Sequence, residues 1–220
     1  MTRMAGQMTD DFELPPADRL PIGGTALQCQ LGEAAIELFY SRGALATTVR
    51  EITGACGLTQ GALYNHFTSK DHLLYVLVRD IHVLANEQMA GALAAAGPEP
   101  ADQLAAMARF LVAHTAGFKK RSRMANREFT VLTGDHRTEV QAIRRQIRDR
   151  LSGVLLAGAE QGVFDLAGGN DLPSATLASA TISSMCVHIS EWTLDHYPLD
   201  LADLQHRYVT MALRIAGASI

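Results

Sequence analysis

The sequence predicts an all-α protein with a small N-terminal helix-turn-helix unit and a larger C-terminal helical bundle. From Thr25 onward, apolar residues recur at three- and four-residue spacing, and no later stretch shows the alternation of a strand. Two short helical patterns separated by Gly57 indicate a helix-turn-helix. The expected units are a flexible arm over residues 1–22, the helix-turn-helix domain over 23–70 and the bundle over 71–220.

The composition is that of a globular protein without a strong overall charge. Of 220 residues, 48% are hydrophobic, and the formal net charge of −4 gives no global attraction to nucleic acid or an acidic membrane. No apolar run approaches the roughly 20 residues of a membrane span, and the first residues lack the apolar centre of a signal peptide. We therefore expect a cytoplasmic protein with no membrane partner. The three cysteines lack metal-ligand spacing, so neither a disulfide nor a zinc site is expected.

The first two helices are marked by their end signals. An apolar stripe precedes Gly43, a residue type that favours a helix C-terminus, so the first helix is expected to end near Arg42. Thr48 lies three residues before Glu51, which is the spacing of a capping box. A short second helix is therefore expected over about residues 49–56.

The third and fourth helices follow in the same way. Thr59 can cap a third helix that runs to about Phe67, and Thr68 or Ser69 can cap a fourth that continues toward Ala96. Beyond residue 100, four further apolar faces at helical spacing predict long helices, with breaks at "TGDH", "DLAGGNDLP" and "DHYPLD". The result is a larger C-terminal bundle that follows the small N-terminal unit.

The third helix carries residue types that suit the reading of bases in the major groove. The amides of Gln60 and Asn65 can donate and accept at once, which matches the edge of adenine. Gly61 and Ala62 allow the helix backbone to approach the bases, and Ala62 can contact a thymine methyl group. Because residues 23–80 are not basic overall, DNA binding has to come from this local arrangement.

Side chains suited to phosphate oxygens surround the same helix. Lys70 falls in the first turn of a helix, where free amides already favour an anion. The candidate DNA-binding residues outside the base-facing set are Thr47, Thr48, Thr59, Tyr64, His66 and Lys70. The alternative is that "ALYNHF" is a packed turn whose polar groups are exposed without a partner. Leu63 and Phe67 are expected to be buried in either case.

The stretch "AAIELFYSRGALATTVREITGACGLTQGALYNHFTSKDHLL", residues 34–74, resembles the DNA-binding domain of TetR-family transcriptional regulators. The resemblance implies a nine-helix homodimer whose last two helices form a four-helix bundle with those of a second copy. It also implies a palindromic operator and a small ligand, held in the bundle, that lowers DNA affinity. Family phosphate contacts fall on Thr48, Tyr64, His66 and Lys70, and base-facing positions on Gln60, Gly61, Ala62 and Asn65.

The bundle would then hold the ligand and dimerise. Polar and aromatic residues that share helix faces could line a cavity, or could be core or interface residues with satisfied polar atoms. The candidate ligand-binding residues are Met107, Phe110, His114, Phe118, Arg127, Ile147, His188 and Trp192. The basic runs "KKRSRMANR" and "RRQIRDR" are either solvated faces or a mouth for a phosphate-bearing or carboxylate ligand. The order of "REFTVL", "IRRQIRDRL", "EQGVF" and Trp192 is similar to branches that respond to acyl-CoA thioesters or lipid and steroid breakdown products.

These observations favour a ligand-responsive repressor that uses no cofactor and has double-stranded DNA, a second copy and a small effector as partners. An enzyme is not expected, because the sequence contains no nucleophile motif, no phosphate-binding glycine loop and no H-E-x-x-H motif. His188 and Glu191 could hold a metal ion, but two ligands alone make a poor site. An architectural DNA-binding protein or an activator without a ligand remains the alternative.

Overall fold

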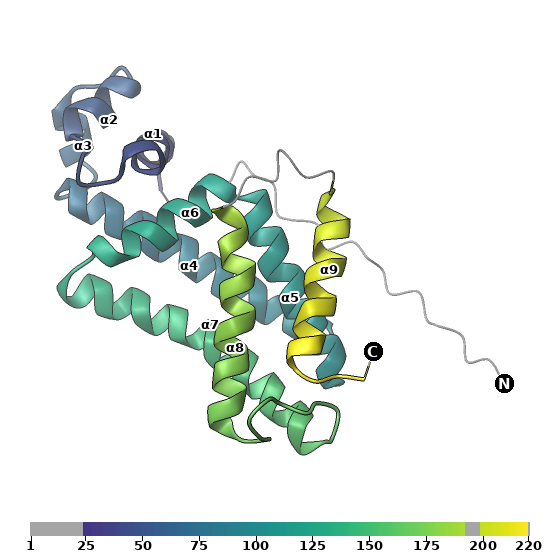
Figure 1. Ribbon diagram of the computed structural model, residues 1–220. Helices are drawn as coiled ribbons and strands as arrows, with labels where there is room; N and C mark the ends of the chain where they lie inside the picture. The colour runs from purple at the N-terminus through teal and green to yellow at the C-terminus, as the bar shows by residue number, and fades with distance from the viewer. Residues whose placement is uncertain (1–23, 192–198, 220) are drawn as a thin grey trace.

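The computed structural model describes residues 24–191 and 199–219. The expected arm over residues 1–22 and the candidate ligand residue Trp192 lie outside this part of the chain. The described residues form nine α-helices, two short 3-10 segments and no strand (Figure 1), which confirms the all-α prediction. None of these helices combines the length and the apolar content that a membrane crossing requires.

The helices pack as an N-terminal group of three and a larger bundle, with α4 running from one to the other (Figure 1). The N-terminal helices are α1 Ala26–Arg42, α2 Val49–Ala55 and α3 Gln60–Tyr64. The others are α4 Lys70–Ala95, α5 Pro100–Gly117, α6 Lys119–Glu128, α7 Gly134–Glu160, α8 Leu172–Val187 and α9 Leu201–Ile215. The 3-10 segments are η1 Phe129–Val131 and η2 His188–Ser190.

The end signals of the first two helices work as expected. Gly43 follows α1 with φ of 88°, a left-handed backbone angle that favours glycine. At α2, the backbone N–H of Thr48 donates to Glu51 Oε2 over 2.8 Å, and the backbone N–H of Glu51 donates to Thr48 Oγ1 over 3.3 Å. The predicted capping box is therefore present.

The third helix departs from the expectation. It ends at Tyr64 rather than near Phe67, and Thr59 makes no side-chain hydrogen bond at its N-terminus, so the predicted cap is wrong. The next helix, α4, begins at Lys70 and is capped by Ser69, whose hydroxyl accepts from the backbone N–H of His72 over 2.9 Å. Of the two candidate caps, Ser69 is therefore the one that caps the helix. The backbone N–H of Thr68 donates to the ring of His72 over 3.2 Å.

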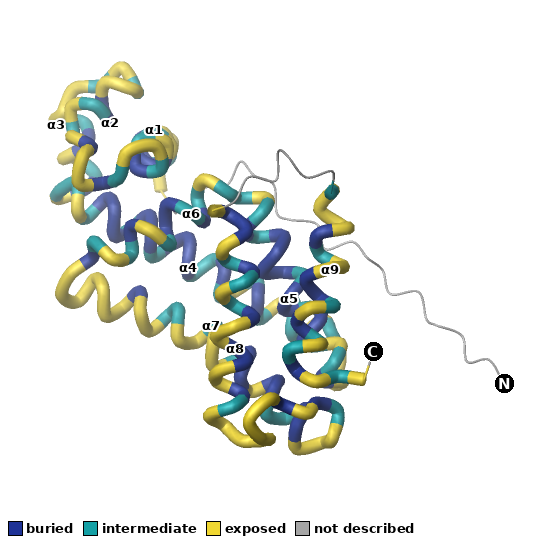
Figure 2. Tube along the Cα trace, viewed as in Figure 1, coloured by how far each residue is buried: buried dark blue, intermediate teal, exposed yellow. Residues whose placement is uncertain are grey.

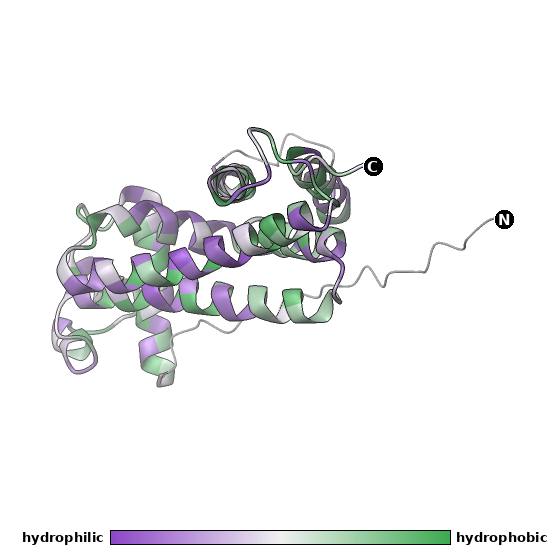
Figure 3. Ribbon diagram, turned by 90° about the horizontal axis from the view of Figure 1, so that it is seen from below, coloured by the Kyte–Doolittle hydropathy of each residue, from purple (hydrophilic) through white to green (hydrophobic). Residues whose placement is uncertain are grey.

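Two hydrophobic cores stabilise the fold. Figure 2 shows how buried and exposed residues are distributed along the helices. One joins α1, α2 and α3 to the first half of α4, and it also includes Met124 from α6 and Val140 from α7. The other joins the second half of α4 to α5, α7, α8 and α9. Apolar and polar residues alternate around the helices of the bundle, as amphipathic packing requires (Figure 3). The helix-turn-helix unit therefore shares its core with helices of the bundle.

Candidate nucleic-acid interface and ligand cavity

The short helix α3 holds its apolar side chains inward and most of its polar ones outward. Leu63 is fully buried and Phe67 is 3% exposed, as predicted. Tyr64 is 54% exposed, although its ring is large and partly apolar. The other predicted base-facing and phosphate-facing positions here are exposed at Thr59, Gln60, Gly61 and Asn65 and half-buried at Ala62 and His66. The face that would meet DNA is therefore open.

The two threonines before α2 are placed differently from one another. Thr47 is 1% exposed, and its hydroxyl donates to the carbonyl of Gly43 over 2.8 Å. This burial contradicts the expected phosphate contact from its side chain, because the hydroxyl instead satisfies a carbonyl at the end of α1. Thr48 is exposed, and its hydroxyl donates to Glu51 Oε2 over 2.8 Å.

Lys70, expected to contact phosphate, is bound to the turn between α1 and α2. Its ammonium group donates to the carbonyl of Ala44 over 2.5 Å and to the carbonyl of Thr47 over 2.7 Å. An ammonium has three N–H donors, so two are used within the protein and one is left for an outside acceptor. Sequence reasoning missed the first role because Ala44 lies 26 residues from Lys70.

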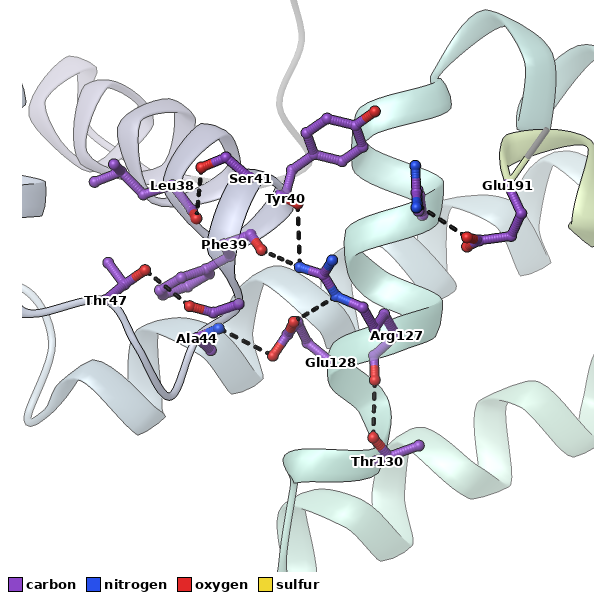
Figure 4. A network of polar contacts seen from close by, with 12 residues as sticks. Leu38, Phe39, Tyr40, Ser41, Ala44, Thr47, Arg127, Glu128, Thr130 and Glu191 are labelled. Carbon is purple, nitrogen blue, oxygen red and sulfur yellow. Dashed lines mark hydrogen bonds and ion pairs between the residues drawn. The ribbon is translucent and has the colours of Figure 1, made fainter. Parts of the chain in front are cut away.

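The same turn is held from the other side by the end of α6 (Figure 4). The carboxylate of Glu128, 3% exposed, accepts from the backbone N–H of Ala44 over 3.1 Å. Arg127 forms an ion pair with Glu128, 2.9 Å between Nε and Oε1, and its Nη2 donates to the carbonyls of Phe39 and Tyr40. The last carbonyls of a helix attract cations. The prediction that Arg127 binds the ligand is therefore corrected: it binds the end of α1.

Other cations of α6 also face α1. Lys120 pairs with Glu37 over 2.8 Å and Arg121 with Glu33 over 2.7 Å. These cations of the run "KKRSRMANR" pair with carboxylates of α1, and none of them lines the cavity described below. They join the bundle to the N-terminal unit.

The remaining arginine of this run accounts for the proposed metal ligand Glu191. Arg123 Nε lies 2.9 Å from Glu191 Oε2, and its guanidinium lies over the ring of Tyr40, 5.5 Å from the centroid. Nδ1 of His188 lies 2.8 Å from the carbonyl of Ser184. Glu191 is therefore paired with Arg123, whereas the contact of His188 involves only Nδ1 and not Nε2.

A cavity of about 290 Å³ lies between α4, α5, α6, α7 and α8. Its buried floor is mainly apolar, with Phe110 and Leu111 from α5 and Ile81 from α4. Its exposed rim includes Arg148 from α7 and Ser184 from α8. Four of the predicted ligand residues lie in its wall: Phe110, His114, Ile147 and His188.

Two other predicted ligand residues lie outside the wall, which corrects those expectations. Met107 is fully buried in the bundle core, where it packs with apolar neighbours. Phe118 packs edge-on against His114, with 5.8 Å between ring centroids, and lies under the guanidinium of Arg121. Spacing of three or four residues predicts that side chains share a helix face. It does not predict whether that face meets the cavity or the core.

Sequence reasoning missed a polar network in the same wall. His82 is buried, and its Nδ1 lies 2.7 Å from the carbonyl of Val78, so Nδ1–H donates. Nη1 of Arg144 then donates to His82 Nε2 and to Asn126 Oδ1, each over 2.8 Å. Burial, and then the charge of Arg144, lowers the pKa of His82 to about 4. Only "RRQIRDR" hinted at this network, because His82 and Asn126 carry no spacing signal.

The cavity is electropositive at its α7 side. Burial, and then the nearby charge of Arg148, lowers the pKa of Arg144. No Asp or Glu occurs among the described residues that line the cavity. The guanidinium of Arg144 instead has the neutral partners His82 and Asn126 and lies over the ring of Phe129, 4.7 Å from its centroid. The arrangement leaves a partly buried positive charge without a lining carboxylate.

Two family models match the chain. Residues 31–76 match "Bacterial regulatory proteins, tetR family", and residues 97–216 match "Tetracyclin repressor-like, C-terminal domain". The second match alone covers more than half of the 220 residues. Together they include α2, α3, the start of α4 and the helices from α5 to α9. Most of the cavity wall lies within them, but Ile81, His82 and Ala85 of α4 fall between the two matches.

Individual relatives agree with these models. The chain is 30% identical over 158 residues to the HTH-type transcriptional repressor KstR2 of Rhodococcus jostii strain RHA1, covering 68% of this chain and 73% of that one. The structure of a bacterial regulatory protein in the tetR family from Rhodococcus RHA1 has 28% identity and a TM-score of 0.78. The match covers 90% of this chain and 100% of that one. AibR, solved with isovaleryl coenzyme A and operator DNA, has a TM-score of 0.75, and the match covers 88% of this chain and 100% of AibR. Because the sequence identity is 22%, this likeness shows the fold alone.

Proposed function

Because the chain belongs to the TetR family of transcriptional regulators, we propose that it is a repressor that binds a palindromic operator as a homodimer and leaves it on binding a small effector. The observation that carries this proposal is the open face of α3. Gln60, Tyr64 and Asn65 are exposed there, while Leu63 fixes the helix from below. Recognition helices of helix-turn-helix proteins read base edges with such a face.

The homodimer is supported by the distribution of exposed apolar side chains. Of the six large hydrophobic residues that are exposed in the described part, four lie on the last two helices: Leu172, Leu177, Leu201 and Met211. Exposed apolar side chains concentrated on two helices agree with an interface that uses those helices. Pairing through α8 and α9 would place two copies of α3 on one DNA duplex, which a palindrome requires.

The effector class follows from the chemistry of the cavity. Its apolar floor suits a hydrocarbon body, and Arg144 and Arg148 suit an anionic group at the α7 side. A volume of 290 Å³ holds about ten water-sized groups, which is enough for a short acyl chain or a small ring system. An acyl-CoA would therefore place its acyl part inside and its nucleotide outside. A lipid or steroid catabolite with an acid group would fit the same description.

The route from the cavity to DNA runs through α4 and α6. The cavity is lined by Ser122, Ala125 and Asn126 of α6, and the same helix binds α1 through Lys120, Arg121 and Arg127. An effector that displaces α6 changes the support of the helix-turn-helix unit. Couplings of this kind are typically about 1–3 kcal/mol, or roughly 5- to 150-fold in affinity.

The test uses the purified full chain and a labelled DNA fragment from upstream of its own gene. Footprinting should show protection of one short palindrome, and anisotropy should show release on titration with acyl-CoAs of increasing chain length. Coenzyme A alone is the ligand control, and Arg144→Met is the protein control, expected to bind DNA normally and to need more acyl-CoA for release.

Two results would reject parts of this proposal. Protection without a defined site would favour an architectural DNA-binding protein. Protection of a palindrome that no acyl-CoA or hydrophobic acid reverses would reject the effector class and leave the operator intact.

A further inference from the structure

Two buried polar atoms in the cavity wall have no hydrogen-bond partner among the described residues. They are Nδ1 of His114, on α5, and Oγ of Ser183, on α8. Two other buried polar side chains of this wall have partners within the protein: His82 contacts Val78 and Arg144, and the Ser122 hydroxyl donates to the carbonyl of His114. The two atoms therefore stand apart from the rest of the wall.

An unpaired buried polar atom lowers stability, since it has lost water and gained no protein partner. His114 lies between the rings of Phe110 and Phe118, with centroids 5.5 Å and 5.8 Å away. Burial there lowers its pKa to about 4, so the ring is neutral near pH 7 and carries one donor and one acceptor nitrogen. A serine hydroxyl also donates and accepts. Both groups can thus bind an uncharged oxygen.

We propose that His114 and Ser183 are specificity-determining residues that hydrogen-bond a carbonyl or hydroxyl oxygen on the hydrophobic body of an acidic effector. This inference rests on the proposed effector cavity and adds a second polar point to it, separate from Arg144 and Arg148 on α7. A plain alkyl acid satisfies the arginines and leaves His114 and Ser183 unpaired. The cavity therefore selects oxygenated hydrophobic acids over their saturated alkyl analogues, because a site with unpaired polar groups rejects ligands that cannot pair them.

The first test needs no ligand. Ser183→Ala removes the unpaired hydroxyl and is expected to raise the Tm of the full chain by roughly 2 to 4 °C. Ser179→Ala is the matched control on the same helix, because the Ser179 hydroxyl donates to the carbonyl of Arg148 over 3.2 Å. This control is expected to lower Tm. A fall in Tm for Ser183→Ala as large as that for Ser179→Ala would overturn the proposal, since Ser183 would then have a partner in solution.

The second test measures binding by calorimetry with octanoyl-CoA and its 5-, 6- and 7-oxo derivatives. Each derivative carries one ketone that octanoyl-CoA lacks, at a different position along the chain. At least one oxo derivative is expected to bind the wild-type chain about tenfold more tightly than octanoyl-CoA. In the double variant His114→Phe, Ser183→Ala this ratio should fall to about one while octanoyl-CoA still binds. A ratio that survives in the double variant would overturn the proposal.

Failure of this inference can be told from failure of the proposed function. If octanoyl-CoA binds and releases DNA but no oxo derivative binds more tightly, only the roles of His114 and Ser183 are rejected. If none of these CoA esters binds, the acyl-CoA class is rejected, and the same comparison is made with octanoate and its oxo acids. Equal binding of octanoate and every oxo acid would then overturn the inference. The Tm comparison then shows separately whether the Ser183 hydroxyl is unpaired.

Discussion

The backbone N–H of Ala44 donates to the carboxylate of Glu128, although the two residues lie 84 positions apart and on opposite sides of the contact between α1 and α6. The carbonyl of the same Ala44 accepts from Lys70. Both backbone polar groups of Ala44, in the turn before α2, are thus bonded to other helices: the N–H to the end of α6 and the carbonyl to the start of α4. These two bonds add to the shared hydrophobic core that joins α2 and α3 to the bundle.

Replacing Glu128 by Ala should therefore destabilise the fold. The variant leaves the buried N–H of Ala44 without its acceptor and Arg127 without its carboxylate, so the free energy of unfolding should fall by about 1–3 kcal/mol. Urea denaturation measures it. Glu33→Ala is the control, because the pair of Glu33 with Arg121 is partly exposed and worth at most about 1 kcal/mol. Equal losses in the two variants would contradict this role of Glu128.

Lys70→Met should have two separate effects. It keeps the apolar stem and removes the donors to Ala44 and Thr47, so the free energy of unfolding should fall by about 1–3 kcal/mol. If the third N–H contacts phosphate, the slope of log affinity against log salt should also fall by about 0.9. Anisotropy at several salt concentrations separates the two. A loss of stability with an unchanged salt slope would mean that Lys70 supports the turn and does not bind DNA.

Asn65→Ala and Tyr64→Phe should affect DNA binding in different ways. Both side chains are exposed at the end of α3. Loss of the Asn65 amide should relax preference at one base pair, worth about 1–3 kcal/mol, whereas loss of the Tyr64 hydroxyl should weaken all sequences alike. Affinities for an operator and its single-base variants test both. Equal weakening of every sequence by Asn65→Ala would remove its base-reading role.

Stability should fall with acidity between pH 6.5 and about 4. The pKa values of His82 and His114 are lowered from 6.5 to about 4, mainly by burial, so in this window the unfolded chain binds protons that the folded chain excludes. Each histidine contributes up to about 3 kcal/mol of stability above pH 6.5, and this contribution is gone below about pH 4. Urea denaturation at pH 7.5 and 4.5 measures the loss.

His114→Phe should reduce this acid sensitivity by about half, because His82 remains. His206→Phe, at an exposed position of α9, is the control and should leave the difference between the two pH values unchanged. If His114→Phe has no larger effect than the control, His114 is not buried in the neutral form.

Much of the N-terminal unit could be predicted because its signals are local. The capping box joins Thr48 to a residue three positions away, and Gly43 ends α1 through its own backbone angle. The burial of Leu63 also followed from helical spacing. The missing side-chain cap at Thr59 shows the limit of such signals, since a residue suited to capping does not have to cap.

The sequence by itself determined the all-helical class, the start of α2, the exposed polar residues of α3 and four members of the cavity wall. Only the tertiary structure decided that Arg127 faces α1, that Thr47 is buried and that Arg144 meets His82. The physical reason is distance along the chain. Periodicity and caps act over three or four residues, whereas Phe39 lies 88 positions from Arg127 and His82 lies 62 positions from Arg144. Such pairs are selected by how the helices pack.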